Sequence, residues 1–282
     1  MRRFRYVVCD VFTDTPLQGN QLAVFTDARD LDSLTMQALA REMNFSETVF
    51  VLPPQAADAD VRIRIFTPRS ELPFAGHPTL GTAFVLGGPL QKIVIRLETS
   101  VGVVPVELER QGAEIVFGSM EQPLPRWRPF DRPAELFAAL GVAGSALPVE
   151  EYELGPGYVF VELASPFDVA ALTPDFEALG GVTSLGVSCF ARDGSRWKTR
   201  VFFTDLGMPE DPATGSAAGP LAVHLARHGR IGFGDEIVIS QGAELGRAST
   251  LYARAEGSAE RLERVVVGGS AKIVARGEFM LP

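Results

Sequence analysis

The sequence predicts a mixed α+β protein made of two similar halves, and three observations support this prediction. The chain has 282 residues, which favours two domains at the usual one to two hundred residues per domain. Short segments rich in Val, Ile and Phe, bounded by Gly, Pro or Asp, dominate the chain and predict strands, whereas helical patterns are few. Two segments about half the chain apart also share one order of strand, acidic loop, glycine and apolar run.

The repeated pattern centres on two glycines, Gly76 and Gly215, which lie 139 residues apart. The first copy begins with the strand-like segment 64–68 and the second with 200–205. In each copy the glycine precedes an apolar run, which predicts a helix whose N-terminus lies beside the end of a strand. A duplicated fold is the simplest interpretation. If the two halves face each other, the two helix N-termini meet in one cleft.

Most predicted elements are strands. Apolar stripes predict helices at Leu31–Met43, with Asp32 as its N-cap, and at Pro133–Leu140. Between Met120 and Pro133 four prolines indicate a crossover between domains. We therefore expect an N-terminal half at 1–122, a C-terminal half at 123–270 and a final strand at about 271–282 that can return to the first half. The predicted strands are 4–12, 20–25, 47–52, 61–66, 92–98, 101–108, 113–118, 157–163, 183–191, 199–204, 236–240, 247–254 and 263–275.

Composition narrows the class of partner. The net charge of −9 and the pI near 5.0 disfavour binding to nucleic acid. The two cysteines, Cys9 and Cys189, lie in apolar runs and are too few for a disulfide framework, which indicates a reduced cytoplasm. Asp10 ends the first apolar stretch too early for a signal peptide, and Pro78–Leu90 is too short and too rich in Gly and Pro to span a membrane. We expect a cytoplasmic protein that acts on a small molecule.

The two predicted helix N-termini can bind an anion. The first turn of a helix leaves about four backbone N–H groups without partners, and the helix dipole is positive there. Pro78 suits the first helical position, and Pro220 indicates that the second helix begins among residues 216–219. The chain contains no phosphate-binding Gly-x-x-x-x-Gly-Lys loop and no Gly-x-Gly-x-x-Gly turn. A carboxylate is therefore the favoured ligand, and an ordinary capped helix is the alternative.

Three polar residues are candidates for acid–base chemistry. Glu47 lies between a predicted helix and a strand, flanked by apolar residues whose desolvation would raise the pKa of its carboxyl group. The alternative is an exposed glutamate at the start of a strand. His77 and Asp211 precede or begin the two glycine helices, where each could contact a substrate or serve only as a cap.

Other catalytic patterns are weak. His224 and His228 are four residues apart, but the pattern lacks the His-Glu-x-x-His arrangement, so we expect no metal site. The chain contains no Gly-x-Ser-x-Gly motif for a serine nucleophile. Neither cysteine has the basic neighbours that would activate a thiolate.

Four motifs are spread over nearly the whole chain: Asp10–Thr13 with Gly19–Asn20, Phe45–Thr48, Phe66–Pro68 with Glu71–Thr79, and Glu210–Ala217. Together, and in this order, they resemble the PhzF-like family of phenazine-biosynthesis isomerases. The resemblance implies the fold of diaminopimelate epimerase, in which each of two pseudo-symmetric domains is a curved, mostly antiparallel sheet or barrel around a central helix.

The resemblance also implies an activity, a proton shift within a dihydro-3-hydroxyanthranilate-like carboxylic acid by a homodimer without metal or cofactor. Related racemases use two cysteines, and Ala75 and a position at or near Pro212 take their places here, which argues against a two-thiol racemase. An epimerase for another small carboxylate and a non-catalytic metabolite-binding protein remain alternatives. The implied catalytic residues are Glu47, His77 and Asp211, and the implied substrate-binding residues are Asn20, Ser46, Gly76, Thr214, Gly215 and Ser216.

Overall fold

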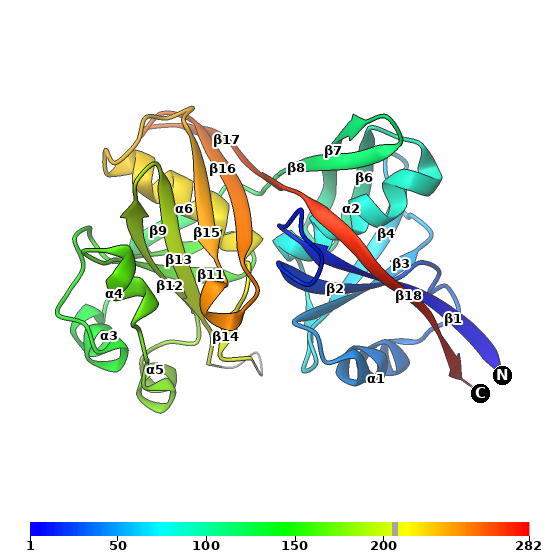
Figure 1. Cartoon of the computed structure of the whole chain (residues 1–282), viewed down its shortest axis with the longest axis horizontal. Coiled ribbons are helices and arrows are strands. Elements are labelled where there is room, and N and C mark those ends of the chain that lie inside the picture. Colours follow the sequence, from blue (N-terminus) through cyan, green and yellow to red (C-terminus); the bar gives the residue numbers. More distant parts are fainter. Residues whose placement is uncertain (205–207, 282) are drawn as a thin grey trace. The chain divides into compact units, whose positions relative to one another are not determined.

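The computed structural model describes residues 1–204 and 208–281. Asp205, the last residue of the expected segment 200–205, and Pro282, at the end of the expected last strand, therefore lie outside the described residues. The chain forms two compact units (Figure 1). The first unit contains Met1–Glu121 and the chain from Gly268 onward, and the second contains Gln122–Val267.

The first unit contains two helices and most of the strands that the sequence predicts for it. Asp32 is the N-cap of the first helix, as predicted, because its carboxylate accepts a hydrogen bond from the backbone N–H of Thr35 at 2.8 Å. The elements are β1 (Arg2–Val11), β2 (Asn20–Phe25), α1 (Ser33–Met43), β3 (Glu47–Leu52), β4 (Val61–Phe66), β5 (Glu71–Leu72), α2 (Gly76–Leu90), β6 (Val94–Thr99), β7 (Gly102–Gln111), β8 (Glu114–Glu121) and β18 (Ala271–Leu281).

The second unit repeats this order with additional short helices. Two of these, α4 and α5, are absent from the sequence prediction because they span less than two or barely two helical turns and carry no clear apolar stripe. The elements are β9 (Arg126–Pro129), α3 (Pro133–Leu140), β10 (Glu150–Glu153), β11 (Gly157–Glu162), α4 (Pro166–Ala170), α5 (Phe176–Val182), β12 (Gly186–Asp193), β13 (Arg196–Phe202), β14 (Glu210–Asp211), α6 (Gly215–Arg227), β15 (Glu236–Gln241), a 3-10 turn (Ala243–Leu245), β16 (Ser249–Gly257) and β17 (Leu262–Gly269), the last of which extends into the first unit.

The strand pairing confirms the predicted duplication. In the first unit β18–β1–β2 is antiparallel, β2–β3 parallel, β3–β4 antiparallel, β4–β6 parallel and β6–β7–β8 antiparallel. In the second unit β9–β10–β11 is antiparallel, β11–β12 parallel, β12–β13 antiparallel, β13–β15 parallel and β15–β16 antiparallel. Each parallel connection passes through a helix, as parallel pairing requires a long crossover. Each half is therefore a mostly antiparallel sheet, as expected.

A buried central helix lies against each sheet (Figure 1). In the first unit α2 contacts β1, β2 and β3 as well as β6, β7 and β8, so the sheet curves around the helix. Residues 76–87 of α2 and 215–226 of α6 are buried throughout. Both helices are rich in glycine and alanine, whose small side chains allow the strands to approach closely.

Gly81 shows how tightly α2 is packed. A Cβ atom at this position would lie 2.6 Å from Val11 Cγ2 and 2.7 Å from Leu22 Cδ2. We expect Gly81→Ala to lower the free energy of unfolding by about 1–2 kcal/mol, because the overpacking outweighs the gain in helix propensity. Gly181 in α5 is the control, since it is exposed and a Cβ atom there meets nothing within 4 Å. Gly181→Ala should be neutral or slightly stabilising in urea unfolding, and equal effects of the two substitutions would contradict this account of the packing.

An arginine–glutamate pair lies at the same place in both units. Arg64 of β4 donates two hydrogen bonds to Glu71 of β5, at 2.7 and 2.6 Å. Arg200 of β13 donates two to Glu210 of β14, at 2.8 and 2.7 Å. Each pair ties the short strand before a glycine helix to the longer strand that precedes it. The ion pairs therefore fix the direction from which the chain enters α2 and α6.

The prediction of one strand at 263–275 is wrong. The strands β17 and β18 are separate, with Ser270 between them. The Ser270 hydroxyl donates to the Val116 carbonyl at 2.8 Å, and its own carbonyl accepts from Thr13 N–H at 3.2 Å. The apolar runs at 265–267 and 273–274 lie on either side of Gly268, Gly269 and Ser270, a turn-forming sequence that the prediction of one strand overlooks. None of the helices among the described residues is long and apolar enough to cross a membrane.

Candidate functional site

The two glycine helices start at equivalent positions. Helix α2 begins at Gly76, so Pro78 is its third residue and the prediction that Pro78 comes first is wrong. Helix α6 begins at Gly215, one residue before the predicted range. The N–H groups of the first two residues of each helix, Gly76 with His77 and Gly215 with Ser216, cannot bond within the helix. Each unit therefore has a helix N-terminus whose first N–H groups have no partner within the helix, the feature on which the predicted anion binding rests.

Pro220 lies farther inside α6 than the sequence analysis expects. It is the sixth residue of the helix, where its missing N–H leaves the Ser216 carbonyl without an intrahelical donor. The neighbouring Gly215 carbonyl accepts a hydrogen bond from Gln122 Nε2 at 2.8 Å. Since the side chain of Gln122 supports the first turn from outside, the helix can begin at Gly215 despite the proline.

Four of the predicted residues meet in the first unit: Asn20, Ser46, Glu47 and His77. Glu47 is the first residue of β3, where Asn44 in a left-handed conformation (φ 52°) ends α1 and turns the chain into the strand. Glu47 Oε2 lies 3.3 Å from His77 Nε2, and the Glu47 side chain is only 12% exposed. The carboxyl group is thus mostly withdrawn from solvent, as the flanking apolar residues predict.

Asn20 completes this group. Its Nδ2 lies 3.3 Å from His77 Nδ1, and its Oδ1 accepts a hydrogen bond from the Ser46 hydroxyl at 2.7 Å. Asn20 and His77 are buried, at 1% and 3% exposure. A row of four polar side chains, Ser46, Asn20, His77 and Glu47, therefore runs through the unit, and we call it the Glu47 chain.

Burial keeps His77 uncharged. Desolvation lowers the pKa of its imidazole from about 6.5 to about 3, and the Gln21 backbone opposes this shift only in part. His77 is therefore neutral at physiological pH and can offer one N–H donor and one lone pair. It can orient or polarise a neighbouring group, but it brings no positive charge.

The depressed pKa of His77 makes stability depend on pH. Between pH 6.5 and about 3 the unfolded chain protonates His77 and the folded chain does not, so unfolding takes up a proton and stability falls as the pH falls. This contribution is about 1.4 kcal/mol for each pH unit below 6.5. We expect His77→Gln to remove this contribution. Between pH 7 and 5 the free energy of unfolding in urea should therefore fall less steeply in the variant, by about 1.4 kcal/mol for each pH unit below 6.5. An unchanged slope in the variant would contradict the buried neutral histidine.

The predicted residues of the second unit also lie together. Asp211, the last residue of β14, accepts a hydrogen bond from the Thr214 hydroxyl at 2.7 Å. Gln241 of β15 holds this turn, because its Nε2 donates to the Asp211 carbonyl at 2.8 Å and its Oε1 accepts from the Thr214 N–H at 3.2 Å. The Ser216 hydroxyl lies 2.6 Å from the Tyr158 hydroxyl.

Sequence reasoning missed Gln241 and Tyr158. Gln241 ends an apolar strand and Tyr158 begins another, and each meets its partner only through the fold. The signal that could have found Gln241 is a polar residue at a position where strand alternation predicts burial. Its 4% exposure is consistent with that pattern. The tyrosine carries no comparable signal, since aromatic residues are ordinary in strands.

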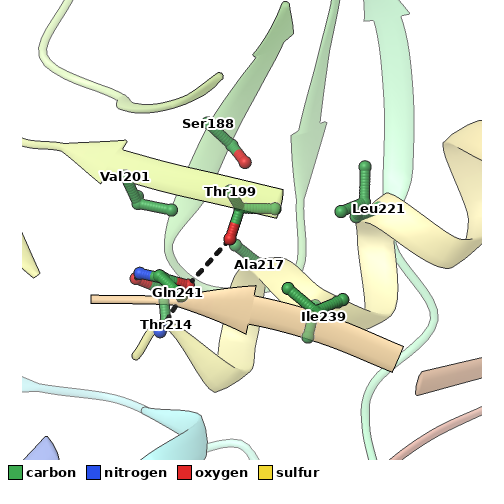
Figure 2. A pocket seen from close by; sticks show the side chains of 9 residues that line it. Ser188, Thr199, Val201, Thr214, Ala217, Leu221, Ile239 and Gln241 are labelled. Atoms are coloured by element: carbon green, nitrogen blue, oxygen red, sulfur yellow. Dashed lines mark hydrogen bonds between the residues drawn. The ribbon is translucent and has the colours of Figure 1, made fainter. Parts of the chain in front are cut away.

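A small cavity lies next to the Asp211 turn (Figure 2). Thr199, Thr214 and Gln241 line its polar side, and the Thr199 hydroxyl donates to Gln241 Oε1 at 3.3 Å. Its volume of about 10 Å³ suits one water molecule and is far too small for an organic acid. The cavity is therefore part of the support beneath α6 and no substrate site.

The ionisable groups do not follow the duplication. Thr48 of β3 pairs with Phe66, and Val187 of β12 pairs with the equivalent Phe202. The residue that corresponds to Glu47 is therefore Gly186. A Cβ atom at Gly186 would lie 2.7 Å from Phe203 and 2.8 Å from Tyr158, which leaves no room for a side chain. The second unit has no counterpart of the Glu47 carboxylate.

His224 and His228 meet a carboxylate that the sequence analysis did not assign to them. Glu150 Oε2 lies 3.3 Å from His224 Nδ1 and 3.0 Å from His228 Nε2. The same oxygen accepts hydrogen bonds from Arg227 at 2.6 Å and from the Tyr152 hydroxyl at 3.0 Å. These donors hold the pKa of Glu150 far below its usual value against the opposing effect of burial. A metal cation at this place would have to displace the Arg227 guanidinium.

Comparisons with known proteins give concordant results. The sequence model of the PhzC-PhzF family, described as phenazine biosynthesis-like protein, matches residues 9–277. A trans-2,3-dihydro-3-hydroxyanthranilate isomerase from Pseudomonas aeruginosa is 54% identical over 277 residues, which cover 98% of this chain and 99% of the relative. The isomerase of the same name from Pseudomonas chlororaphis is 51% identical over 98% of this chain and 99% of its own length.

Solved structures share the fold. A phenazine biosynthesis protein of the PhzF family from Bacillus anthracis superposes with a TM-score of 0.86 at 25% identity, over 100% of both chains. A hydroxyproline epimerase from Agrobacterium vitis superposes with a TM-score of 0.70 over 98% of this chain and 92% of its own. At 14% identity, this likeness concerns the fold alone.

Proposed function

We propose that this chain, which belongs to the PhzC-PhzF family of phenazine biosynthesis-like proteins and is an isomerase, converts trans-2,3-dihydro-3-hydroxyanthranilate by moving one proton within it. The observation that carries the proposal is 54% identity, over nearly the full length of both chains, with an isomerase named for this substrate. The substrate is an amino-substituted cyclic carboxylic acid, which agrees with the carboxylate that the two helix N-termini favour.

Glu47 is the proposed general base and acid. Its ionised carboxylate removes a proton from a carbon of the substrate, the electron pair of that C–H bond shifts the ring double bonds, and the protonated Glu47 returns a proton to another carbon. One C–H bond breaks and one forms, so the step needs no oxidant or reductant. Because the Glu47 side chain is only 12% exposed, little bulk water competes with the substrate for the carboxylate.

The other proposed roles follow from position. His77, kept neutral by burial, and Asp211, held by Thr214, are proposed to contact the amino or hydroxyl group of the substrate. We propose that the N–H groups at the start of each glycine helix, Gly76 in α2 and Gly215 with Ser216 in α6, are carboxylate-binding groups. Thr214 holds the Asp211 carboxylate, Asn20 contacts His77 and Ser46 contacts Asn20, and we propose that these three residues also take part in binding the substrate. The division into N-terminal and C-terminal epimerase-like domains, the cytoplasmic location and the homodimer stay predictions.

The test is turnover in deuterated water. Purified protein is incubated with trans-2,3-dihydro-3-hydroxyanthranilate, and the products are analysed by chromatography and mass spectrometry. We expect an isomer of equal unlabelled mass, with deuterium at the new C–H position to the extent that the protonated Glu47 exchanges with solvent before it returns the proton. Binding without isomerisation would support the alternative of a metabolite-binding protein. Exchange at the α-carbon of proline or another amino acid, without action on the anthranilate-type substrate, would support an epimerase instead.

A further inference from the structure

We propose that Asn20 is a positioning residue, whose amide holds His77 in the tautomer that carries its ring proton on Nε2 and so presents an N–H group to Glu47. The sequence resemblance implies only that Asn20 contacts the substrate. The structure assigns it a second partner, the Nδ1 atom of His77 at 3.3 Å. The catalytic consequence of this inference rests on the proposed function, whereas the tautomer itself does not.

Two proton arrangements are possible along the Glu47 chain. In the first, the Ser46 hydroxyl donates to Asn20 Oδ1, Asn20 Nδ2 donates to His77 Nδ1, and His77 Nε2–H faces Glu47. In the second, His77 carries its proton on Nδ1 and the Asn20 amide is reversed. The Nδ1–H group then donates a hydrogen bond to the side-chain carbonyl of Asn20 or to the backbone carbonyl of Gln21. The positions of the heavy atoms, 2.7, 3.3 and 3.3 Å apart, are the same in both.

The electrostatics at Glu47 decide between them. An ionised carboxylate only accepts hydrogen bonds. In the second arrangement the Nε2 lone pair would face Glu47 Oε2 at 3.3 Å, in a place where the histidine side chain is 4% exposed and water cannot screen the repulsion. In the first arrangement Ser46 donates to Asn20 and Asn20 donates to His77, and the negative charge of Glu47 attracts the Nε2–H group that faces it at 3.3 Å. A base that must be ionised before it accepts a proton therefore selects the Nε2–H tautomer.

This arrangement suits a base. A neutral N–H donor orients the carboxylate, whereas an imidazolium at the same distance would stabilise its charge much more and so weaken it further as a base. The buried, uncharged His77 orients Glu47 at the smaller cost to its basicity. Asn20 contributes because an amide nitrogen can donate to Nδ1 without attracting a second proton to the ring. An aspartate of the same shape would accept from Nδ1–H and favour the other tautomer or the imidazolium.

The direct test is the ¹⁵N spectrum of labelled histidine. The chain contains three histidines, so the spectrum is simple, and His77→Gln identifies the signals of His77. In the wild-type protein at pH 7.5 we expect the unprotonated, pyridine-type signal on Nδ1 and the protonated signal on Nε2. Asn20→Asp should remove that pattern. A wild-type proton on Nδ1, or an unchanged tautomer in Asn20→Asp, would overturn the proposal whether or not the protein turns over the proposed substrate.

Kinetics separate positioning from substrate contact. With a measurable activity, Asn20→Asp should lower kcat at least tenfold, with KM within about threefold, since an incorrect tautomer of a catalytic histidine can cost up to about 10⁴ in kcat. A rise in KM with an unchanged kcat would show that Asn20 only binds substrate, which contradicts the positioning role. Ser46→Ala, at a half-buried position, is the second variant in case Asn20→Asp fails to fold, and it should weaken the tautomer preference.

Discussion

Replacing Glu47 by glutamine is expected to lower kcat by about 10²–10⁴-fold while the affinity for a non-reacting anthranilate-type acid changes by less than about threefold. The range is the usual contribution of general acid–base catalysis. The glutamine keeps the shape of the side chain, so its amide can occupy the position of the carboxylate, whose Oε2 lies 3.3 Å from His77 Nε2 in the wild-type protein. It cannot take up a proton from carbon. The loss should therefore appear in the chemical step and leave the fold and the binding intact.

Single-turnover kinetics and calorimetric titration with the inert acid measure the two quantities separately. Glu42→Gln is a matched control, because Glu42 lies on the exposed side of α1 five residues earlier and the same change removes one negative charge. The control should retain wild-type kcat. Undiminished turnover in Glu47→Gln, or an equal loss in both variants, would end the assignment of Glu47 as the base.

Much of the fold follows from local sequence patterns. The strands at 47–52 and 61–66 agree residue for residue with β3 and β4, because runs rich in β-branched and apolar residues end there in turn-forming residues. The duplicated glycine segments predict the two central helices, because an apolar run follows the glycine in each. The starts of these helices differ from prediction: Pro78 is the third residue of α2, where an N–H group has no partner within the helix, and Pro220 lies deeper in α6, where Gln122 supports the first turn through the Gly215 carbonyl.

The candidate site is less accessible to sequence reasoning. Glu47, His77 and Asp211 stand out by their motifs, but their neighbours come from distant parts of the chain. Tyr158 is 58 residues from Ser216, and Gln241 is 30 residues from Asp211. Such contacts depend on strand register, which a single sequence does not specify. The role of Asn20 toward His77 is of the same kind, since 57 residues separate them.

The second large effect is expected at Arg200, where Arg200→Met should lower the free energy of unfolding of the second unit by about 3–5 kcal/mol. The Arg200 and Glu210 side chains are 9% and 8% exposed. The same guanidinium also donates to three backbone carbonyls, those of Val169, Ala170 and Leu172, at 3.4, 3.1 and 2.7 Å. Methionine would leave a buried carboxylate and these carbonyls without their donor. Urea unfolding, followed separately for each transition, measures the loss.

The duplication supplies an internal control for this prediction. Arg64 and Glu71 repeat the ion pair in the first unit, but they are 18% and 36% exposed. Among the residues that the structure describes, the other hydrogen-bond partners of Arg64 are the side chains of Ser33 and Met36. Because solvent reaches this pair, Arg64→Met should cost about 1 kcal/mol or less. The double variant Arg200→Met/Glu210→Leu should recover part of the loss, since it removes the buried charge but leaves the three carbonyls unpaired.

The same comparison separates stability from positioning. Glu210 precedes Asp211 on the two-residue strand β14, so release of Glu210 should also loosen the turn that holds the Asp211 carboxylate. Arg200→Met should therefore lower activity below the temperature at which the second unit unfolds, whereas Arg64→Met should affect activity less. If both arginine variants lost the same stability, burial would not be what distinguishes the two ion pairs, and the argument that Arg200 fixes the entry to α6 would fail.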